Sequence, residues 1–312
     1  MIGKLSKVFG YASEFGVDCV RAIKHNYQSP FEPRMERVHF RILILAHAIE
    51  KGLSLHDPRR MFGRAKIDEL LNLMQVYGGH KPELPMRMAL GALRQYHRMH
   101  EDLQNDLLER IAVQCDHFEK EYGLQPDGGT FASGSIGIDR PIWEQRSSCR
   151  IYQPQKVDLQ TVEQVIESAS KAPSQCNRQS VRVHCYQNRQ TIASLLQLQG
   201  GSTGFSEQVS NLFVISSKLV AWGGPNQRNQ GFIDGGLFAM TLMLACHDKG
   251  LASCPLNLAV SNSREREIRT VGNIPHGHRL IMMLAFGYPA EPSFKAARSR
   301  RLEPSEIVTF DV

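Results

Sequence analysis

Two short polar segments carry residue types that could bind a phosphate and a flat ring. The first is Arg146-Ser147-Ser148-Cys149-Arg150, in which two arginines enclose two hydroxyl groups. Guanidinium groups give a phosphate both charge and paired hydrogen bonds, and the serines add further donors. The second is Ala172-Pro173-Ser174-Gln175-Cys176-Asn177-Arg178-Gln179, whose hydroxyl and amide groups suit the edge of a flat heterocycle. In this order the two segments predict a site for a phosphate-bearing ring compound.

The bulk composition is that of a globular protein with an anionic small-molecule ligand. The chain has 312 residues, of which 42% are hydrophobic and 22% charged, so a sizeable core is expected. The formal net charge is +6, and nearly all of the excess lies after residue 142. That distribution suits a phosphate-bearing cofactor. A nucleic-acid surface would show a denser basic stripe within a known motif, so no nucleic-acid partner is expected.

The cysteine and histidine patterns argue against disulfide and metal sites. The seven cysteines are odd in number and irregular in spacing, and no CxxC pair occurs. His276 and His278 lack a clear third ligand, so no metal site is expected. No signal peptide is recognisable after Met1, and no apolar run approaches the roughly 20 residues that span a bilayer. The sequence therefore predicts a cytoplasmic protein with free thiols.

The chain divides into a helical first part and a mixed second part. Residues 1 to about 125 show helical periodicity, including one amphipathic run along Leu90, Leu93, Tyr96, Leu103, Leu107 and Ile111. A Gly-, Ser- and Pro-rich stretch follows, which places the domain boundary near residue 140 and predicts domains of 1–140 and 141–312. In the second domain we expect helices over 159–172 and 235–250, and strands over 181–186, 212–216 and 280–286. This order predicts an α+β sheet with helices packed on it.

Residues 143–310 resemble the nitroreductase family of FMN flavoproteins. Five segments match in the family's order: Arg146, Ser148, Arg150 and Tyr152; Ala172 to Gln179; Asp234-Gly235-Gly236 through Gly250-Leu251; Ser253-Cys254-Pro255-Leu256-Asn257, expected as a loop; and Gly287-Tyr288-Pro289-Ala290-Glu291. The resemblance implies the α+β class, with a nitroreductase-like mixed sheet flanked by helices. An all-helical N-terminal region precedes it.

The resemblance also implies a set of cofactor-binding residues and a homodimer. Arg146 and Ser148 would hold the phosphate or ribityl chain of FMN, and Arg150 would lie near the pyrimidine side of its ring. Pro173, Ser174 and Gln175 would come from the partner subunit, because family members bind FMN at a dimer interface. The complete implied set is Arg146, Ser147, Ser148, Arg150, Pro173, Ser174, Gln175, Asn177, Gln179, Leu256, Asn257, Arg298 and Arg301.

The activity that the resemblance implies is FMN-dependent oxidoreduction. NAD(P)H would reduce the flavin, and an electron-poor small molecule would then take the electrons in a ping-pong cycle, with the chemistry on the flavin rather than on a catalytic side chain. Two departures keep other functions open: Ser180-Val181 replaces a frequent Pro-Trp, and Asn257-Leu258 replaces a frequent Glu-Gly. The alternatives are a reductive dehalogenase, an oxidase of a biosynthetic intermediate, and a non-catalytic binding or assembly module.

Four further features have competing interpretations. Glu50 is either a functional carboxylate or part of a helix C-terminus, and the second is favoured. Residues 3–27 form either a membrane-surface helix or a docking helix, and docking is favoured. Residues 200–204 lack the Lys-Ser/Thr ending of a phosphate loop, so an active-site loop is the preferred interpretation. Cys149, Cys176 and Cys254 are interpreted as soft residues that fill space.

Overall fold

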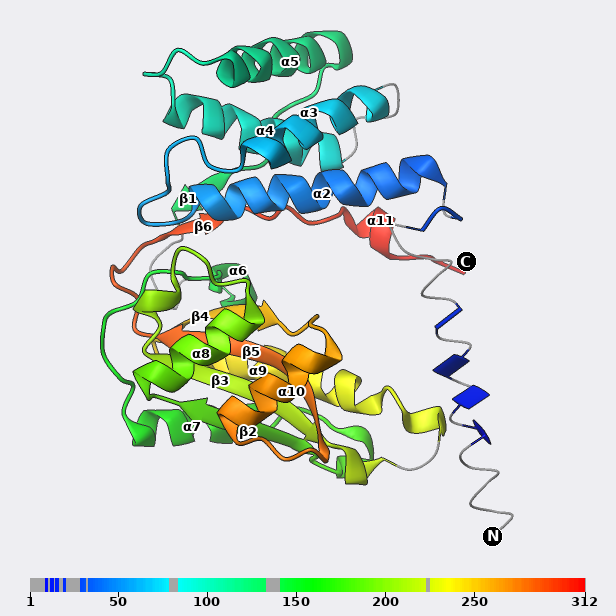
Figure 1. The fold of residues 1–312 in the computed structure, drawn as a ribbon, viewed down its shortest axis with the longest axis vertical. Coiled ribbons are helices and arrows are strands. Elements are labelled where there is room, and N and C mark those ends of the chain that lie inside the picture. The colour runs from blue at the N-terminus through cyan, green and yellow to red at the C-terminus, as the bar shows by residue number, and fades with distance from the viewer. Residues whose placement is uncertain are drawn as a thin grey trace. The chain divides into compact units, whose positions relative to one another are not determined.

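The computed structural model describes residues 9–10, 12–13, 15–16, 19–20, 29–31, 33–78, 84–132, 141–222 and 225–311. The chain forms two compact units (Figure 1). The helical unit comprises Val17–Ala132 and Lys295–Val312, and the sheet unit comprises Met1–Gly16 and Ser133–Phe294. The last residues of the chain thus group with the helices rather than with the sheet. The helix predicted over residues 3–27 lies largely outside the described residues.

The helical unit is a packed set of helices with a small two-stranded sheet. Its helices are α2 (Arg34–Leu53), α3 (Arg64–Tyr77), α4 (Leu84–Met99), α5 (Asp106–Tyr122) and the short α11 (Pro304–Ile307). Strands β1 (Thr130–Ala132) and β6 (Lys295–Ala297) pair antiparallel. Apolar residues of α2 to α5 face one another in a buried core, because their 3–4-residue spacing puts them on one face of each helix. The helical character predicted for this part is confirmed.

One expected helix is in fact two. The periodic run from Leu90 to Ile111 is divided between α4 and α5, and Leu103 is exposed in the turn between them. Asn105 causes the break, because its side chain accepts a hydrogen bond from the amide of Leu107 at 2.9 Å and starts a new helix. Apolar periodicity continued across the turn, so it could not reveal this boundary.

The sheet unit is α+β, as expected. Its elements are α6 (Ile142–Gln145), α7 (Leu159–Ala169), β2 (Val181–Tyr186), α8 (Arg189–Gln199), β3 (Asn211–Lys218), α9 (Gln230–Asp248), β4 (Ala252–Asn257), α10 (Asn262–Gly272) and β5 (His278–Gly287). Short 3-10 turns lie at Gln175–Asn177, Ser206–Gln208, Leu219–Ala221 and Pro225–Gln227. The strand order is β2-β3-β5-β4 with antiparallel pairing, and an isolated parallel bridge joins Ser148 to Ser253. The pairings between the four named strands are all antiparallel, and the parallel contact is limited to that bridge.

The core of the sheet unit lies between the sheet and helices α7 and α9. Phe213 of β3 and Phe286 of β5 stack there, with ring centroids 3.9 Å apart. Gly235 allows α9 to approach β5, because a Cβ at that position would meet Ile281 at 2.7 Å. Helix α9 therefore packs on the sheet and shares its core with α7, β3 and β5 (Figure 1).

Candidate functional site

The first polar segment, residues 146–150, is held against strand β4 by backbone pairing. The amide of Cys149 donates to the carbonyl of Ser253 at 3.0 Å, beside the parallel bridge between Ser148 and Ser253. Leu256 and Asn257, which the sequence also predicted to meet the cofactor, lie three and four residues further along the same strand. Two of the predicted site segments are thus neighbours in the structure.

The expectation that residues 253–257 form a loop is wrong, because they belong to strand β4. Pro255 cannot donate a hydrogen bond to a neighbouring strand, which makes the segment resemble a loop in sequence. Strand β4 is the last in the order β2-β3-β5-β4, so the missing amide costs no pairing with another strand. Pro255 is exposed, and its register partner is Leu284 of β5.

The groups around the first segment suit a phosphate. Arg150 is only 6% exposed, and Arg146, Ser147 and Ser148 are half-buried beside it. The hydroxyl oxygen of Ser253 is buried and makes no hydrogen bond within the described part of the chain. A buried hydroxyl without a partner is costly, and an anion acceptor would satisfy it. The donor set of two guanidinium groups and neighbouring hydroxyls therefore fits a phosphate-bearing ligand.

The pKa values of His247 and Cys149 reflect the electrostatics around the first segment. Burial lowers the pKa of His247 at the C-terminal end of α9, and the positive charge of Arg146 lowers it further, which places Arg146 close to that end. Burial also raises the pKa of the Cys149 thiol to about 12. A thiol that stays protonated is a poor nucleophile, in keeping with the space-filling interpretation of Cys149.

The second polar segment folds as a tight, strained loop. Cys176 and Gln179 have φ angles of 50° and 48°, in the left-handed region that residues with a Cβ rarely occupy. The amide of Gln179 donates to the hydroxyl of Ser174 at 3.1 Å and closes the loop. Asn177 ends the 3-10 turn that opens the loop at Gln175.

Asp234 anchors this loop to α9, close to the N-terminal end of the helix. Its carboxylate accepts from the amide of Gln175 at 3.1 Å and from the side chain of Gln230 at 2.7 Å, and the residue is 2% exposed. The side-chain oxygen of Gln175 is buried and lacks a partner among the described residues. A cavity of about 430 Å³ lies beside the loop, lined among others by Pro173, Ser174, Gln179, Arg182, Asp234 and Phe238.

The two polar segments lie at opposite ends of α9. The second segment is bonded to Asp234 near the N-terminal end, and the first segment lies near His247 in the last turn. Thirteen residues separate 234 from 247, which corresponds to about 20 Å along the helix. The two segments of the single chain therefore contact opposite parts of α9.

Arg298 and Arg301 belong to the helical unit. Arg298 pairs with Asp127 at 3.5 Å, and that carboxylate also binds Arg300 at 2.6 Å and Arg87 at 2.8 Å. Arg301 donates to the carbonyl of Ser299. The antiparallel pairing of β1 with β6 holds this basic segment.

The structure gives partners for two other singled-out features. Glu50 is fully buried near the end of α2, where its carboxylate accepts from the amide of Gly129 at 2.9 Å. The loop at 200–204 is tied to β4, because Gln199 accepts from the amide of Gly201 at 2.7 Å and donates to the carbonyl of Asn257 at 2.9 Å. Within the described ranges, no group of three or more His, Cys, Asp or Glu residues could hold a metal ion.

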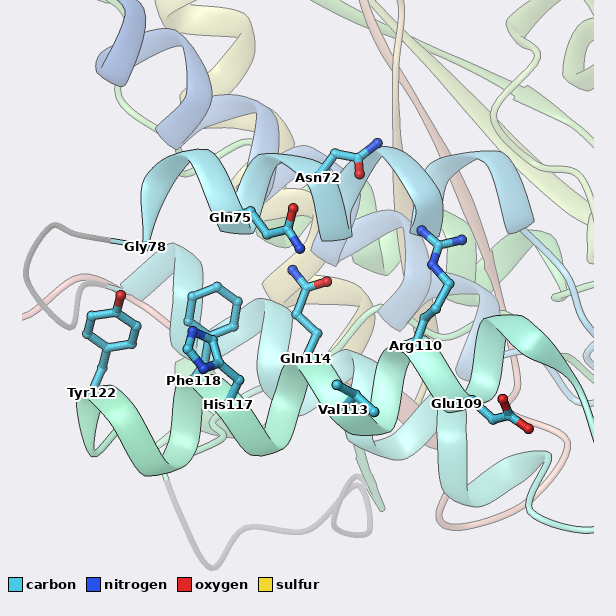
Figure 2. Close-up of a pocket in the computed structure, with 10 residues that line it drawn as sticks. All are labelled: Asn72, Gln75, Gly78, Glu109, Arg110, Val113, Gln114, His117, Phe118 and Tyr122. Carbon is cyan, nitrogen blue, oxygen red and sulfur yellow. The ribbon is translucent and has the colours of Figure 1, made fainter.

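A separate cavity of about 550 Å³ lies between α3 and α5 of the helical unit (Figure 2). Gln75 and Gln114 face one another across it, and His117, Phe118 and Tyr122 gather near Gly78. Gln114 donates to the carbonyl of Leu71 at 2.5 Å. None of the predicted site residues lines this cavity.

Two residues beside these segments were not among the predicted site residues. Asp234 was quoted only as part of a helix match, although a carboxylate near the N-terminal end of a long apolar helix is an available anchor for neighbouring amides. Ser253 was quoted only as part of the matched segment 253–257, and its place beside the first polar segment comes from the bridge to Ser148. No helix among the described residues is long and apolar enough to cross a membrane.

The second half of the chain matches the model of one known protein family. The model of the nitroreductase family matches residues 143–219 and 212–288. No curated protein matches the sequence.

Several solved structures resemble the chain at low identity. An FMN-dependent nitroreductase from Clostridium difficile is 17% identical, with 55% of this chain and 98% of that one covered and a TM-score of 0.44. A nitroreductase-like protein from Exiguobacterium sibiricum, solved in complex with FMN, is 18% identical, with 55% and 95% covered and a TM-score of 0.48. A nitroreductase family protein from Clostridium novyi is 16% identical, with 48% and 84% covered and a TM-score of 0.44.

Proposed function

Because residues 143–288 form a domain of the nitroreductase family, we propose that this protein is an FMN-dependent oxidoreductase that uses NAD(P)H to reduce an electron-poor small molecule. The family assignment supports the general class of flavin oxidoreductase. FMN, when bound, supplies the hydride and electron chemistry. The donor and the acceptor would occupy the same cavity in turn, which is a ping-pong scheme. The reducing cytoplasm is the proposed location.

The first segment and β4 would hold the cofactor within one protomer. Arg146, Ser147 and Ser148 offer charge and hydroxyl donors to the phosphate or ribityl chain. Arg150 keeps its positive charge in buried surroundings, where it stabilises negative charge on a nearby ring. Leu256 and Asn257 would meet the ring through their backbone. Arg298 and Arg301 remain proposed phosphate contacts.

The separation of the two segments along α9 carries the proposal of a homodimer. A ring bound near β4 needs the second segment to come from elsewhere, since the chain's own copy lies about 20 Å away. Helix α9 presents an exposed apolar stripe at helical spacing, formed by Ile233, Leu237 and Met240. Burying such a stripe against its copy stabilises association. Two α9 helices packed antiparallel would bring Pro173, Ser174, Gln175, Asn177 and Gln179 of each protomer to the first segment of its partner.

The first experiment tests cofactor binding itself. The purified protein should carry a flavin spectrum or bind added FMN. Arg146→Ala should weaken FMN binding by about tenfold, because a charged hydrogen bond contributes roughly 1.5–3 kcal/mol. A colourless protein that binds no added FMN would contradict the proposal.

Mixed dimers then test the shared site. Co-expression of an Arg146→Ala protomer with a Ser174→Trp protomer gives a heterodimer in which one site holds both defects and the other holds none. We expect about half the wild-type amount of FMN in that heterodimer and little in either mutant homodimer. If each site were built from one chain, the heterodimer would contain no intact site. Weak FMN binding by the heterodimer would therefore contradict the shared site while leaving FMN dependence intact.

A further inference from the structure

The strain in the loop Ser174–Ser180 needs an explanation. Cys176 and Gln179 are both in the left-handed region, although neither is glycine. Such conformations persist only when surrounding contacts hold them, and they gather at functional positions. Asp234 holds the entrance of the loop through the amide of Gln175. The far end of the loop requires its own anchor.

Arg178 provides that anchor through a set of contacts with the segment after β3. Its guanidinium donates to the carbonyl of Ala221 and to the side-chain oxygen of Gln227, both at 2.8 Å. The same group lies over the ring of Trp222, with its central carbon 5.4 Å from the ring centroid. This placement combines hydrogen bonds with a cation–π contact, which is the geometry that a planar guanidinium favours over an ammonium group.

Trp222 is itself fixed in place beside the loop. Its indole N–H donates to the hydroxyl of Ser217 at 3.2 Å, and that oxygen lies 2.9 Å from the hydroxyl of the buried Ser180. A Cβ on Gly231 would lie 3.1 Å from both Ser217 Oγ and Trp222 Nε1. The glycine at the start of α9 therefore leaves room for the indole hydrogen bond. The contacts join the entrance of the loop to α9 through Asp234, and its far end to β3 and the segment that follows β3.

We propose that Arg178 and Trp222 form a latch that keeps the loop Ser174–Ser180 in the one conformation that the cofactor requires. Neither residue lines the cavity of about 430 Å³, whereas Pro173, Ser174 and Gln179 do, so both act as positioning residues. Without the latch the loop relaxes from its strained angles, and FMN binding must restore the order. The inference rests on the proposed FMN-dependent function.

The experiment uses the full chain with its native sequence as the parent protein. Arg178→Ala and Trp222→Leu are compared with Arg189→Ala, an exposed arginine of α8 with no hydrogen bond or ion pair to the described residues. The readouts are the FMN dissociation constant and, in apo-protein, the hydrogen-exchange rates of the amides of Gln175 and Gln179, which are bonded to Asp234 and Ser174 in the closed loop. Circular dichroism and the urea midpoint identify any variant that fails to fold.

Both latch variants should weaken FMN binding by about tenfold, or about 1.4 kcal/mol. They should also speed hydrogen exchange of these two amides by about tenfold, because exchange requires the loop to open and the free energy of opening falls by the same amount. Arg178→Lys and Trp222→Phe keep a cation or a ring and should give intermediate values. Arg189→Ala should match the parent in both readouts.

The two readouts separate the latch from the proposed function. If the parent protein binds no FMN, the proposed function fails, yet the hydrogen-exchange rates still decide whether the latch exists. If the parent binds FMN and the latch variants exchange and bind as the parent does, the latch is overturned and the proposed function stands. A variant that unfolds is replaced by its conservative counterpart.

Discussion

The two polar segments at the ends of α9 are secured in different ways. The segment at residues 146–150 lies along β4 and is held by a backbone hydrogen bond between Cys149 and Ser253. The loop at residues 174–180 contains two strained residues and is held by side chains, among them Asp234 and Arg178. A left-handed conformation costs about 1–2 kcal/mol for a residue with a Cβ.

This difference predicts how each segment responds to mutation. Backbone pairing does not depend on side-chain identity, so substitutions in the first segment should change charge and binding while the fold persists. The second segment depends on a few side chains, so their loss should change conformation. The four predictions below test this contrast, starting from the largest expected effect.

Asp234→Ala should lower the free energy of unfolding by about 3 kcal/mol. The substitution leaves the amide of Gln175 and the side chain of Gln230 without their buried acceptor, and such losses cost roughly 1–3 kcal/mol or more when the partner is charged. Urea unfolding measures the change. Asp248→Ala is the matched control at the other end of α9, where the exposed carboxylate has only a long pair with Lys249. Equal stability of the two variants would contradict the anchoring role.

Gly235→Ala should destabilise the protein by about 2 kcal/mol, because the new Cβ would meet Ile281 at 2.7 Å and overpack the core. The neighbouring Gly236→Ala meets nothing within 4 Å and should stabilise α9 by up to about 1 kcal/mol through helix propensity. Thermal unfolding of the two variants should therefore show changes in stability of opposite sign. Two changes of the same sign would show that α9 does not pack on β5 as described.

Leu237→Glu on the exposed stripe of α9 should disrupt the proposed dimer and weaken FMN binding by about tenfold, since a buried charge without a partner opposes association. Light scattering and flavin titration measure both effects. Val113→Glu, at a 71% exposed apolar residue of α5 in the helical unit, serves as the control and should leave both unchanged. A dimer that survives the α9 substitution would place the interface elsewhere.

The smallest effect concerns pH near the first segment. The pKa of His247 lies below its usual value in the folded state, so stability is present above the unfolded pKa of about 6.5 and is lost as pH falls through the folded pKa. Arg146→Ala removes one cause and should raise the pKa of His247 in an NMR titration. Binding of a phosphate-bearing ligand nearby should also raise it. If the pKa of His247 were the same in Arg146→Ala as in the wild type, Arg146 would not lie close to His247.

The sequence was informative where local pattern and tertiary structure agree. The apolar run at Leu212–Ser216 lies within the buried strand β3. The polar segments around Arg146 and Ser174 were singled out by residue type, order and spacing, and their role in binding stays a prediction. The sequence pattern was misleading where the structure of a segment depends on its neighbours in space. Pro255 was assigned to a loop, because proline is tolerated in a strand at the edge of a sheet and only the strand order shows that β4 is such a strand. Asn105 ended a helix inside a run that remained periodic in apolar residues.

The sequence by itself determined which groups are available to hold a phosphate-bearing ring, since charge, hydroxyl and amide chemistry belong to residue types. It also determined the helical and α+β character of the two halves, because apolar spacing selects which face of each element can be buried. Only the tertiary structure decided that Ser253 lies beside the first segment, that Asp234 and Arg178 hold the second, and that α9 keeps the two about 20 Å apart. These relations join residues distant in the chain, and they form only when packing against the sheet fixes where each helix begins and ends.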